Sequence, residues 1–145
     1  MNKPSMILNL ILLPLLAFNV WSAQPDARQH LLLDFNWKFL QSDTSGAEKQ
    51  NFDDSKWRTL NLPHDWSIEG EFKQDAPTKG AGGYLPTGIG WYRKHLTMPA
   101  IRKDEQFWIE FDGVYMNSDV WINGEHLGKH PYGYTSFYYD LTPFI

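Results

Sequence analysis

Acidic side chains that could carry hydrolytic chemistry gather in one stretch of the chain, residues 64–90. Four of them fall close together there: Asp65, Glu69, Glu71 and Asp75. Retaining glycoside hydrolysis needs two carboxyl groups about 5–5.5 Å apart, one as nucleophile and one as acid/base, and this spacing allows such a pair. A long polar loop also carries acids that only cap turns or face solvent. We expect that role for this cluster.

Asp65 has two roles open to it, because it stands in the turn-forming sequence Pro63-His64-Asp65-Trp66. Its carboxylate can accept hydrogen bonds from backbone N–H groups as the chain turns. The same carboxylate can instead accept hydrogen bonds from the vicinal hydroxyls of a sugar. The residue types alone leave both roles open.

Other chemistries are excluded by residues that the chain lacks. There is no cysteine, so disulfides, thiolate nucleophiles and cysteine-based zinc sites are absent. No Gly-x-Ser-x-Gly nucleophile motif occurs, and the glycine-rich run at 80–83 is not followed by the Lys-Ser/Thr of a phosphate loop. The five histidines do not stand at metal-ligand spacing: His30, His64, His95, His126 and His130. We therefore expect no metal site, no cofactor and no catalytic residue in this chain.

The composition indicates one folded domain. The chain has 145 residues, of which 42% are hydrophobic and 21% charged. A net charge of −4 argues against nucleic acid or an anionic membrane as a partner. Aromatic residues make up 16% of the chain. We expect about three in four of these rings in a core, leaving the others free to stack on sugar rings.

The N-terminus has the pattern of a secretory signal peptide over residues 1–23. Lys3 precedes an apolar run at 6–20, and Ser22 and Ala23 are small residues suited to cleavage. The alternative is a membrane anchor, but the run is shorter than the ~20 apolar residues that a span needs. We therefore expect a secreted or periplasmic protein with no stable membrane span. Residues 24–32 are polar enough for a linker.

Short segments that alternate in polarity or are bounded by turn residues predict strands throughout the rest of the chain. These segments are residues 33–40, 59–62, 91–98, 106–112, 118–122, 125–128 and 136–141. Asn123-Gly124 separates two of them, and this dipeptide favours a type I′ hairpin because both positions need positive φ. No segment has convincing helical periodicity. The pattern predicts an antiparallel β-sandwich over residues 33–145.

The long loop and the C-terminus of the sequence are the two irregular features of this predicted sandwich. A long irregular loop at 64–90 is costly to order, and such loops usually carry function. The chain stops at Ile145, directly after an apolar strand and a Thr-Pro turn. A sandwich would normally pair that edge with a further strand. We expect a C-terminally truncated domain that lacks its last strand or strands.

Four motifs give the chain a resemblance to a known family. They are LPHDW at 62–66, GYLPTGIGWYRK at 83–94, FDGVYMNSDVWING at 111–124 and GYTSFYYDLT at 133–142. Together they resemble the N-terminal sugar-binding domain of family-two glycoside hydrolases, and within that family the β-galactosidases. The resemblance implies a galactose-binding-like jelly roll, followed by an immunoglobulin-like domain and a catalytic (β/α)₈ barrel. The acid/base and nucleophile glutamates would lie on that barrel, beyond Ile145.

The resemblance also implies which residues would lie near the substrate. The LPHDW loop and the loop at 129–134 would lean over the active site of the barrel. Asp65, Trp66 and Tyr132 are therefore candidates for the substrate rim. Tyr132 falls where the best-known β-galactosidases place an aspartate that touches the sugar and a sodium ion. Tyrosine supplies no such carboxylate, so we expect no sodium site here.

The function expected from this resemblance belongs to a larger protein. We expect the non-catalytic N-terminal domain of a secreted retaining β-galactosidase that acts on terminal β-galactosides and that could be a homo-oligomer. A β-glucuronidase and a β-mannosidase of the same family are alternatives. A free-standing carbohydrate-binding module, or a sandwich that only makes contacts between domains, is a further alternative. Whether the reading frame continues after Ile145 would discriminate between them.

Overall fold

The computed structural model describes residues 28–98 and 100–145. The predicted signal peptide and the first part of the predicted linker lie outside the described residues. The chain divides into two units, Met1–Leu31 and Leu32–Ile145. Residues 28–31 are exposed and carry no strand or helix, and all regular structure described here belongs to the second unit.

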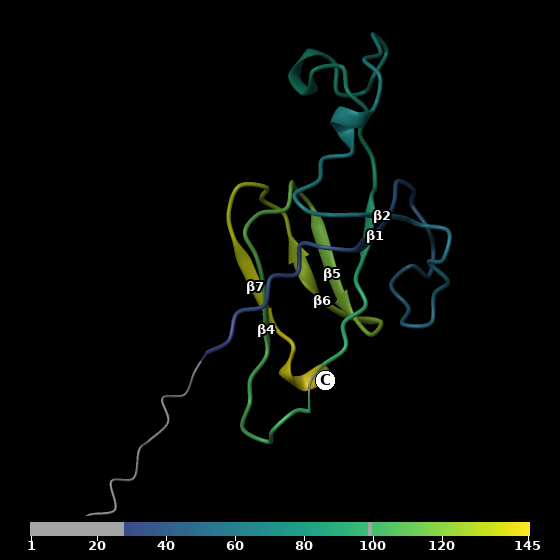
Figure 1. Ribbon diagram of the computed structural model, residues 1–145. Coiled ribbons are helices and arrows are strands. Elements are labelled where there is room, and N and C mark those ends of the chain that lie inside the picture. The colour runs from purple at the N-terminus through teal and green to yellow at the C-terminus, as the bar shows by residue number, and fades with distance from the viewer. Residues whose placement is uncertain (1–27, 99) are drawn as a thin grey trace, which may run out of the picture. The chain divides into compact units, whose positions relative to one another are not determined.

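The long loop begins and ends in one three-stranded antiparallel sheet. β1 (Trp37–Leu40) is its central strand, in the order β2-β1-β3 (Figure 1). β2 (Arg58–Leu60) and β3 (Trp91–Arg93) pair with the two edges of β1. Phe39 of β1 lies opposite Tyr92 of β3, and their ring centroids are 4.8 Å apart. The chain therefore leaves this sheet at β2 and returns to it at β3.

A second sheet joins two strands that are distant in sequence. β4 (Trp108–Phe111) and β7 (Phe137–Asp140) pair antiparallel. Phe111 lies opposite Phe137, and their rings stack with centroids 4.9 Å apart. Such aromatic cross-strand pairs stabilise a sheet by about 0.2–1 kcal/mol each.

The third sheet is the hairpin that the sequence predicted. β5 (Ser118–Ile122) and β6 (Glu125–His130) pair antiparallel around Asn123-Gly124. The two turn residues have φ values of 53° and 94°, as a type I′ turn requires. The hairpin prediction is confirmed.

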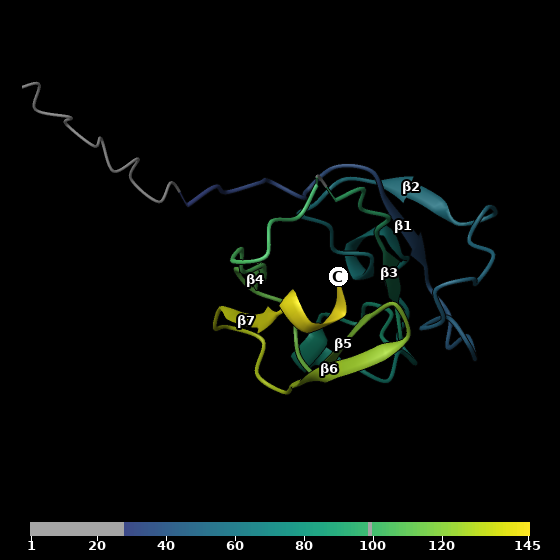
Figure 2. The same cartoon turned by 90° about the horizontal axis from the view of Figure 1, so that it is seen from below.

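The fold is all-β, as predicted. The described residues contain no α-helix, only the short 3₁₀ turns η1 (Ser67–Glu69), η2 (Gly80–Gly82) and η3 (Thr142–Phe144). Seen from below, the three sheets surround a common interior (Figure 2). No helix in the described part of the chain is long and apolar enough to span a bilayer.

The first predicted strand begins later than its alternating pattern suggested. Asn36 has φ of 60°, in the left-handed region, and its N–H donates to Oδ1 of Asn61 at 3.0 Å. This side-chain acceptor holds a bend at Asn36, so regular pairing starts only at Trp37. Phe35 consequently lies outside the strand and is exposed, although the predicted strand over residues 33–40 included it.

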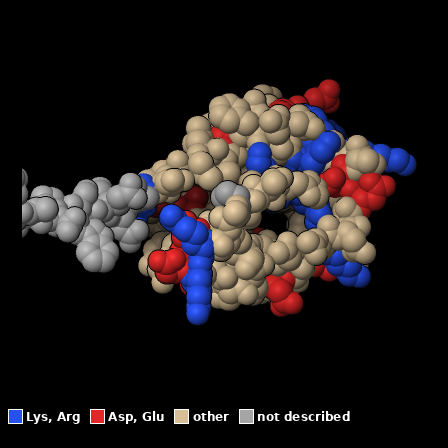
Figure 3. Space-filling model, turned by 60° about the horizontal axis from the view of Figure 1, so that its bottom comes forward, with Lys and Arg blue, Asp and Glu red and all other residues tan. Residues whose placement is uncertain are grey.

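The prediction that about three in four aromatic rings are buried was wrong. Among the aromatic residues of the described part, only Phe39 and Trp57 are buried. Each sheet has only two or three short strands, so the aromatic rings on its inner face are covered by other side chains on only part of their surface. Trp91 of β3 and Trp121 of β5 illustrate this. Their ring centroids are 5.2 Å apart, yet both side chains remain partly exposed. Figure 3 shows a hollow between the sheets at the lower end of the sandwich.

Candidate functional site

The carboxylate of Asp65 caps the turn that opens the long loop. Its Oδ1 atom accepts hydrogen bonds from the backbone N–H of Ser67 at 2.9 Å and from the Ser67 hydroxyl at 2.7 Å. The 3₁₀ turn η1 starts at Ser67. The side chain is exposed, and its Oδ2 atom makes no hydrogen bond with any other described residue. The turn-capping role is therefore observed, and the second oxygen remains free for a hydroxyl donor.

His64 ties the same loop to the three-stranded sheet. Only 10% of its side chain is exposed, and Nδ1 lies 2.7 Å from the Tyr92 hydroxyl. Its Nε2 atom lies 2.9 Å from Nη2 of Arg58 and 3.1 Å from Oε1 of Glu69. Arg58 also donates to Oε2 of Glu69 at 2.7 Å. The four side chains form one network, which we call the His64 network.

The Phe39 ring packs against two members of the His64 network. The Phe39 ring meets the His64 ring edge-on at 4.9 Å, and the Arg58 guanidinium lies 5.2 Å from the Phe39 centroid. Cation–π contacts of this kind contribute about 0.5–1 kcal/mol at exposed sites. The base of the loop is thus fixed by side chains from β1, β2 and β3.

Trp66 packs against the end of the loop. A Cβ atom at Gly90 would lie 2.9 Å from Nε1 of Trp66 and 3.1 Å from Cε2 of Phe39. Only glycine leaves room for this close approach of the indole to the backbone. Trp66 is therefore half-buried against β3, and only part of its ring is available to a ligand.

The ionisation of the network does not favour acid catalysis. The hydrogen bond from Arg58 lowers the pKa of Glu69 below its usual value, with a smaller contribution from His64. A catalytic acid needs the opposite shift, so that it keeps a proton near neutral pH. Burial raises the pKa of Tyr92 to about 12, and the negative charges of Asp65 and Glu69 add to this shift. The arrangement can position groups and bind hydroxyls, but its Glu69 carboxyl is unsuited to act as a general acid.

Tyr132 lies in an exposed cluster of three tyrosines, which we call the tyrosine cluster. The Tyr132 and Tyr134 centroids are 5.6 Å apart, and those of Tyr115 and Tyr134 are 5.9 Å apart. A Cβ at Gly133 would lie 2.9 Å from the Tyr115 ring, so this glycine permits the contact. The N–H of Asn117 donates to the carbonyl of Pro131 at 3.3 Å and joins the two loops.

Sequence reasoning identified Tyr132 but missed its two neighbours. Tyr134 stands two residues after Tyr132, and this spacing could have predicted that the two rings lie close together. Tyr115 comes from a different loop, and no sequence pattern connects it to them. Among the described residues, no hydrogen bond or ring contact joins Asp65 or Trp66 to Tyr132. The three predicted rim residues therefore form two groups within the described structure, and their role as a rim stays a prediction.

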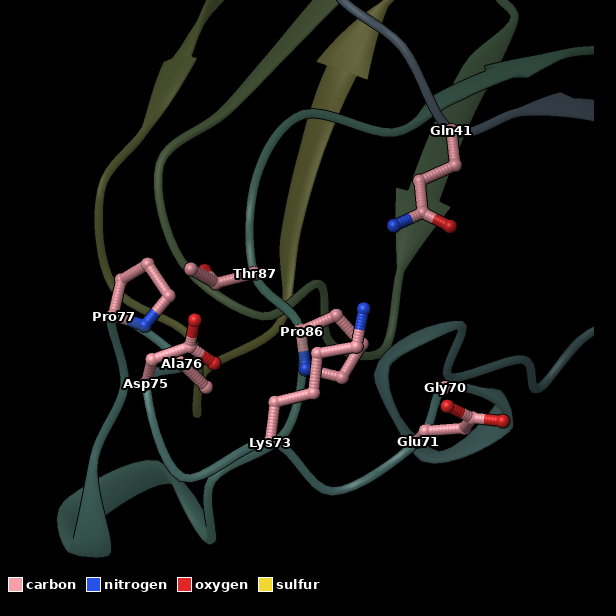
Figure 4. Close-up of a pocket in the computed structure, with 9 residues that line it drawn as sticks. All are labelled: Gln41, Gly70, Glu71, Lys73, Asp75, Ala76, Pro77, Pro86 and Thr87. Carbon is pink, nitrogen blue, oxygen red and sulfur yellow. The ribbon is translucent and has the colours of Figure 1, made fainter.

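The middle of the long loop forms a cavity that sequence reasoning missed. It measures about 500 Å³ and includes charged side chains from Glu71, Lys73 and Asp75 (Figure 4). The N–H of Lys73 donates to the carbonyl of Tyr84 at 3.0 Å, which ties the two arms of the loop together. A Cβ at Gly70 would lie 2.3 Å from Cγ of Pro86, so the arms also touch at their base.

The described acidic and histidine side chains do not gather in a group suited to a metal ion. Within residues 28–98 and 100–145, no group of three or more His, Asp or Glu side chains could hold a metal ion. The four acidic residues of the long loop have three different places in the structure. Asp65 caps a turn, Glu69 belongs to the His64 network, and Glu71 and Asp75 line the cavity.

The fold defines the chain as an all-β domain whose antiparallel sheets form a sandwich. No protein-family model matches the chain. It is 54% identical over 114 residues to the β-galactosidase BoGH2A of Bacteroides ovatus, covering 77% of this chain and 13% of that protein. It is 35% identical over 111 residues to a β-glucuronidase of Formosa agariphila, covering 76% of this chain and 11% of that protein.

A solved structure has the same fold. It is a glycosyl hydrolase family 2 member from Bacteroides cellulosilyticus, with a TM-score of 0.74 and 47% identity over 77% of this chain and 15% of that chain. The chain belongs to glycoside hydrolase family 2 and matches the N-terminal region of its enzymes. It thus spans only a small part of the length of the relatives that it matches.

Proposed function

We propose that this chain is the N-terminal, non-catalytic domain of a secreted retaining glycosidase that hydrolyses terminal β-galactosides. The observation that carries the proposal is the 54% identity to a β-galactosidase over 114 residues. The nucleophile and acid/base glutamates of this mechanism would come from a separate catalytic domain of the same polypeptide. The lowered pKa of Glu69 supports this division, because it leaves the carboxyl of the His64 network unsuited to donate a proton.

The role of the domain would be to narrow the substrate pocket. The His64 network holds the turn that carries Asp65 and Trp66, so these side chains would meet a sugar without further ordering. Preordered contacts lower the entropy that binding must overcome. The free Oδ2 of Asp65 would accept a hydroxyl, and the Tyr132 ring would offer a stacking face. A wall of this kind would favour removal of one terminal sugar at a time.

A β-glucuronidase is the second candidate, because a β-glucuronidase of Formosa agariphila is 35% identical over 111 residues. The two substrates differ at C4, where the hydroxyl is axial in a galactoside and equatorial in a glucuronide, and at C6, where a glucuronide carries a carboxylate and a galactoside a hydroxymethyl group. A pocket that pairs a cation with the carboxylate would reject the neutral sugar. This choice would be made largely by residues outside the present domain.

The first test is an assay of the full polypeptide that contains this domain. Hydrolysis of 4-nitrophenyl β-galactoside, β-glucuronide and β-mannoside would be compared by kcat/KM, and the anomer first released would be identified by NMR. We expect the galactoside to be preferred by about a hundredfold or more, with retention of configuration. Preference for the glucuronide would show instead that the full protein is a β-glucuronidase. Failure to hydrolyse any of the three would overturn it.

A second test addresses the role of the domain. Because Gly70 and Pro86 touch, residues 71–85 can be replaced by a short Gly-Ser linker without separating the loop ends. We expect the shortened enzyme to lose its preference for terminal sugars and to show a raised KM. Unchanged specificity and rate would contradict a role for the long loop at the pocket.

A further inference from the structure

The outer face of the β4–β7 sheet displays two aromatic rings and two carboxylates in alternation. Trp108 and Glu110 point outward from β4, and Tyr138 and Asp140 from β7, while the residues between them are less exposed. In the strand register, Trp108 lies opposite Asp140 and Glu110 lies opposite Tyr138. Each ring is therefore the cross-strand neighbour of a carboxylate. We call these four side chains the outer face.

The two rings of the outer face are ordered against each other but open to solvent. The Trp108 and Tyr138 centroids are 5.5 Å apart with the planes inclined at 69°. Trp108 is 54% exposed and Tyr138 is 66% exposed. Within the described residues, β4 and β7 pair only with each other, so no further strand of the same sheet flanks them.

The carboxylates of the outer face are free to accept hydrogen bonds. Glu110 forms no ion pair or side-chain hydrogen bond with any residue that the structure describes. Asp140 uses Oδ1 to accept the N–H of Thr142 at 2.9 Å, which fixes its side chain and leaves Oδ2 available. The face thus combines flat apolar rings with acceptors that carry negative charge.

This combination selects among ligand classes. Phosphate groups and anionic lipid surfaces would be repelled by two carboxylates. The buried centre of a protein interface is depleted in Glu and Asp, because both would lose their hydration without a compensating partner. A neutral saccharide suits both kinds of side chain on the outer face. Its C–H faces stack on the aromatic rings, and its hydroxyls donate hydrogen bonds to the carboxylates.

We propose that the outer face of β4–β7 is a binding site for neutral saccharides. Trp108 and Tyr138 supply the stacking surfaces, and Glu110 and Asp140 accept hydrogen bonds from sugar hydroxyls. The site lies on the sheet surface, separate from the predicted rim residues of the loops. It holds a polysaccharide chain and does not take part in bond cleavage, so the proposal does not require the proposed β-galactosidase activity.

The test uses the full polypeptide that contains this domain and native gel electrophoresis through soluble galactan or glucomannan, with polygalacturonate as the anionic comparison. We expect retardation by at least one neutral polysaccharide and none by polygalacturonate. The variant Trp108→Ala/Tyr138→Ala should lower the association constant about tenfold or more, because two ring contacts are lost. The variant Glu110→Gln/Asp140→Asn, which preserves shape and the bond to Thr142, should lower it severalfold. The control Tyr84→Ala, which removes an exposed ring from the long loop, should leave it unchanged.

Hydrolysis of a small aryl glycoside reports on folding and on the proposed function separately. Unchanged aryl glycoside turnover in the Trp108→Ala/Tyr138→Ala variant, together with lost retardation, supports a distinct saccharide site. Retardation that survives this variant, or that is absent from the unmodified protein with every neutral polysaccharide, overturns the proposal. A change in oligomeric state caused by the variant would also overturn it, because the face would then be a contact between protein copies.

Discussion

The Nδ1 atom of His64 lies 2.7 Å from the hydroxyl oxygen of Tyr92, although the two residues are 28 positions apart in the sequence. His64 follows β2 and Tyr92 lies in β3, so this contact joins the two ends of the long loop. The stability of the base therefore decides how well the turn at Asp65 is held.

Removing the Tyr92 hydroxyl should loosen that base. In Tyr92→Phe the imidazole of His64, which is nearly buried, loses the partner of Nδ1, and an unpaired buried polar group costs about 1–3 kcal/mol. We expect a lower urea midpoint and faster amide exchange in residues 64–69. Tyr84→Phe is the control, because Tyr84 is exposed and its hydroxyl makes no hydrogen bond with the described residues. Equal midpoints for the two variants would show that the contact contributes nothing.

Tyr92 should also make stability fall at alkaline pH. Burial raises its pKa from 10.0 to about 12, so between these values the folded chain holds a proton that the unfolded chain has released. The folded state is then favoured below pH 10, and this contribution is lost as the pH rises towards 12. Urea midpoints measured from about pH 9 to about pH 12 should decline more steeply in the native protein than in Tyr92→Phe. Parallel curves would contradict the assignment.

A second clamp holds the loop that precedes β2. Arg93 of β3 donates through Nε to Oδ2 of Asp54 at 3.0 Å, and only 11% and 13% of the two side chains are exposed. The guanidinium also donates to the carbonyls of Ala47 and Lys49. Removing one partner of a buried ion pair costs about 3–5 kcal/mol, and we expect a smaller loss for Arg93 because Nε2 of His95 also lies 2.8 Å from Oδ2 of Asp54.

A double-mutant cycle measures this clamp. Arg93→Met and Asp54→Asn should each lower the free energy of unfolding, and the double variant should be less destabilised than the sum of the two. Arg102 and Glu105 form the matched control, because their ion pair is exposed and such pairs contribute at most about 1 kcal/mol. Additive effects at Arg93 and Asp54 would show that the pair does not act as a unit.

Gly90 should tolerate no side chain. In Gly90→Ala the new methyl group would lie 2.9 Å from the Trp66 indole nitrogen and 3.1 Å from the Phe39 ring, so one of these rings must move. Overpacking of this kind costs about 1–3 kcal/mol. Gly113→Ala is the control, since the nearest atom to its methyl group would be a carbonyl oxygen at 4.0 Å. Near-ultraviolet circular dichroism would detect displacement of Trp66, and an unchanged spectrum in Gly90→Ala would refute the packing.

The sequence predicted those features that depend on neighbouring residues. Alternation located β1, β4 and β7, and Asn123-Gly124 located the β5–β6 hairpin, because both signals reflect local backbone preferences. The turn cap at Asp65 was also readable, since donor and acceptor stand two residues apart.

Features that depend on distant residues were not readable. His64 meets Tyr92 only after the chain has returned from the long loop, and Tyr115 meets Tyr134 from a separate loop. No spacing rule connects such partners. The number of buried rings was misjudged for the same reason, because burial depends on how far the three sheets cover one another and not on residue type.

The two roles of Asp65 can be separated by one substitution. Asp65→Asn keeps an oxygen that can accept the N–H of Ser67, but it removes the negative charge that a sugar hydroxyl would meet. If Asp65 only caps the turn, the full-length enzyme should keep its KM and kcat. If Asp65 also lies at the substrate rim, as we expect, KM for an aryl β-galactoside should rise about tenfold, since a hydrogen bond to a charged group contributes about 1.5–3 kcal/mol.

Asp53 provides the matched control for this experiment. Its Oδ1 atom accepts the N–H of Ser55 at 3.0 Å, in the same two-residue geometry as Asp65 and Ser67 but in a different loop. Asp53→Asn should therefore reproduce any effect of the substitution on the turn itself and leave KM unchanged. Equal kinetic effects in the two variants would reduce Asp65 to a structural cap, whereas a rise in KM confined to Asp65→Asn would place its free oxygen at the sugar.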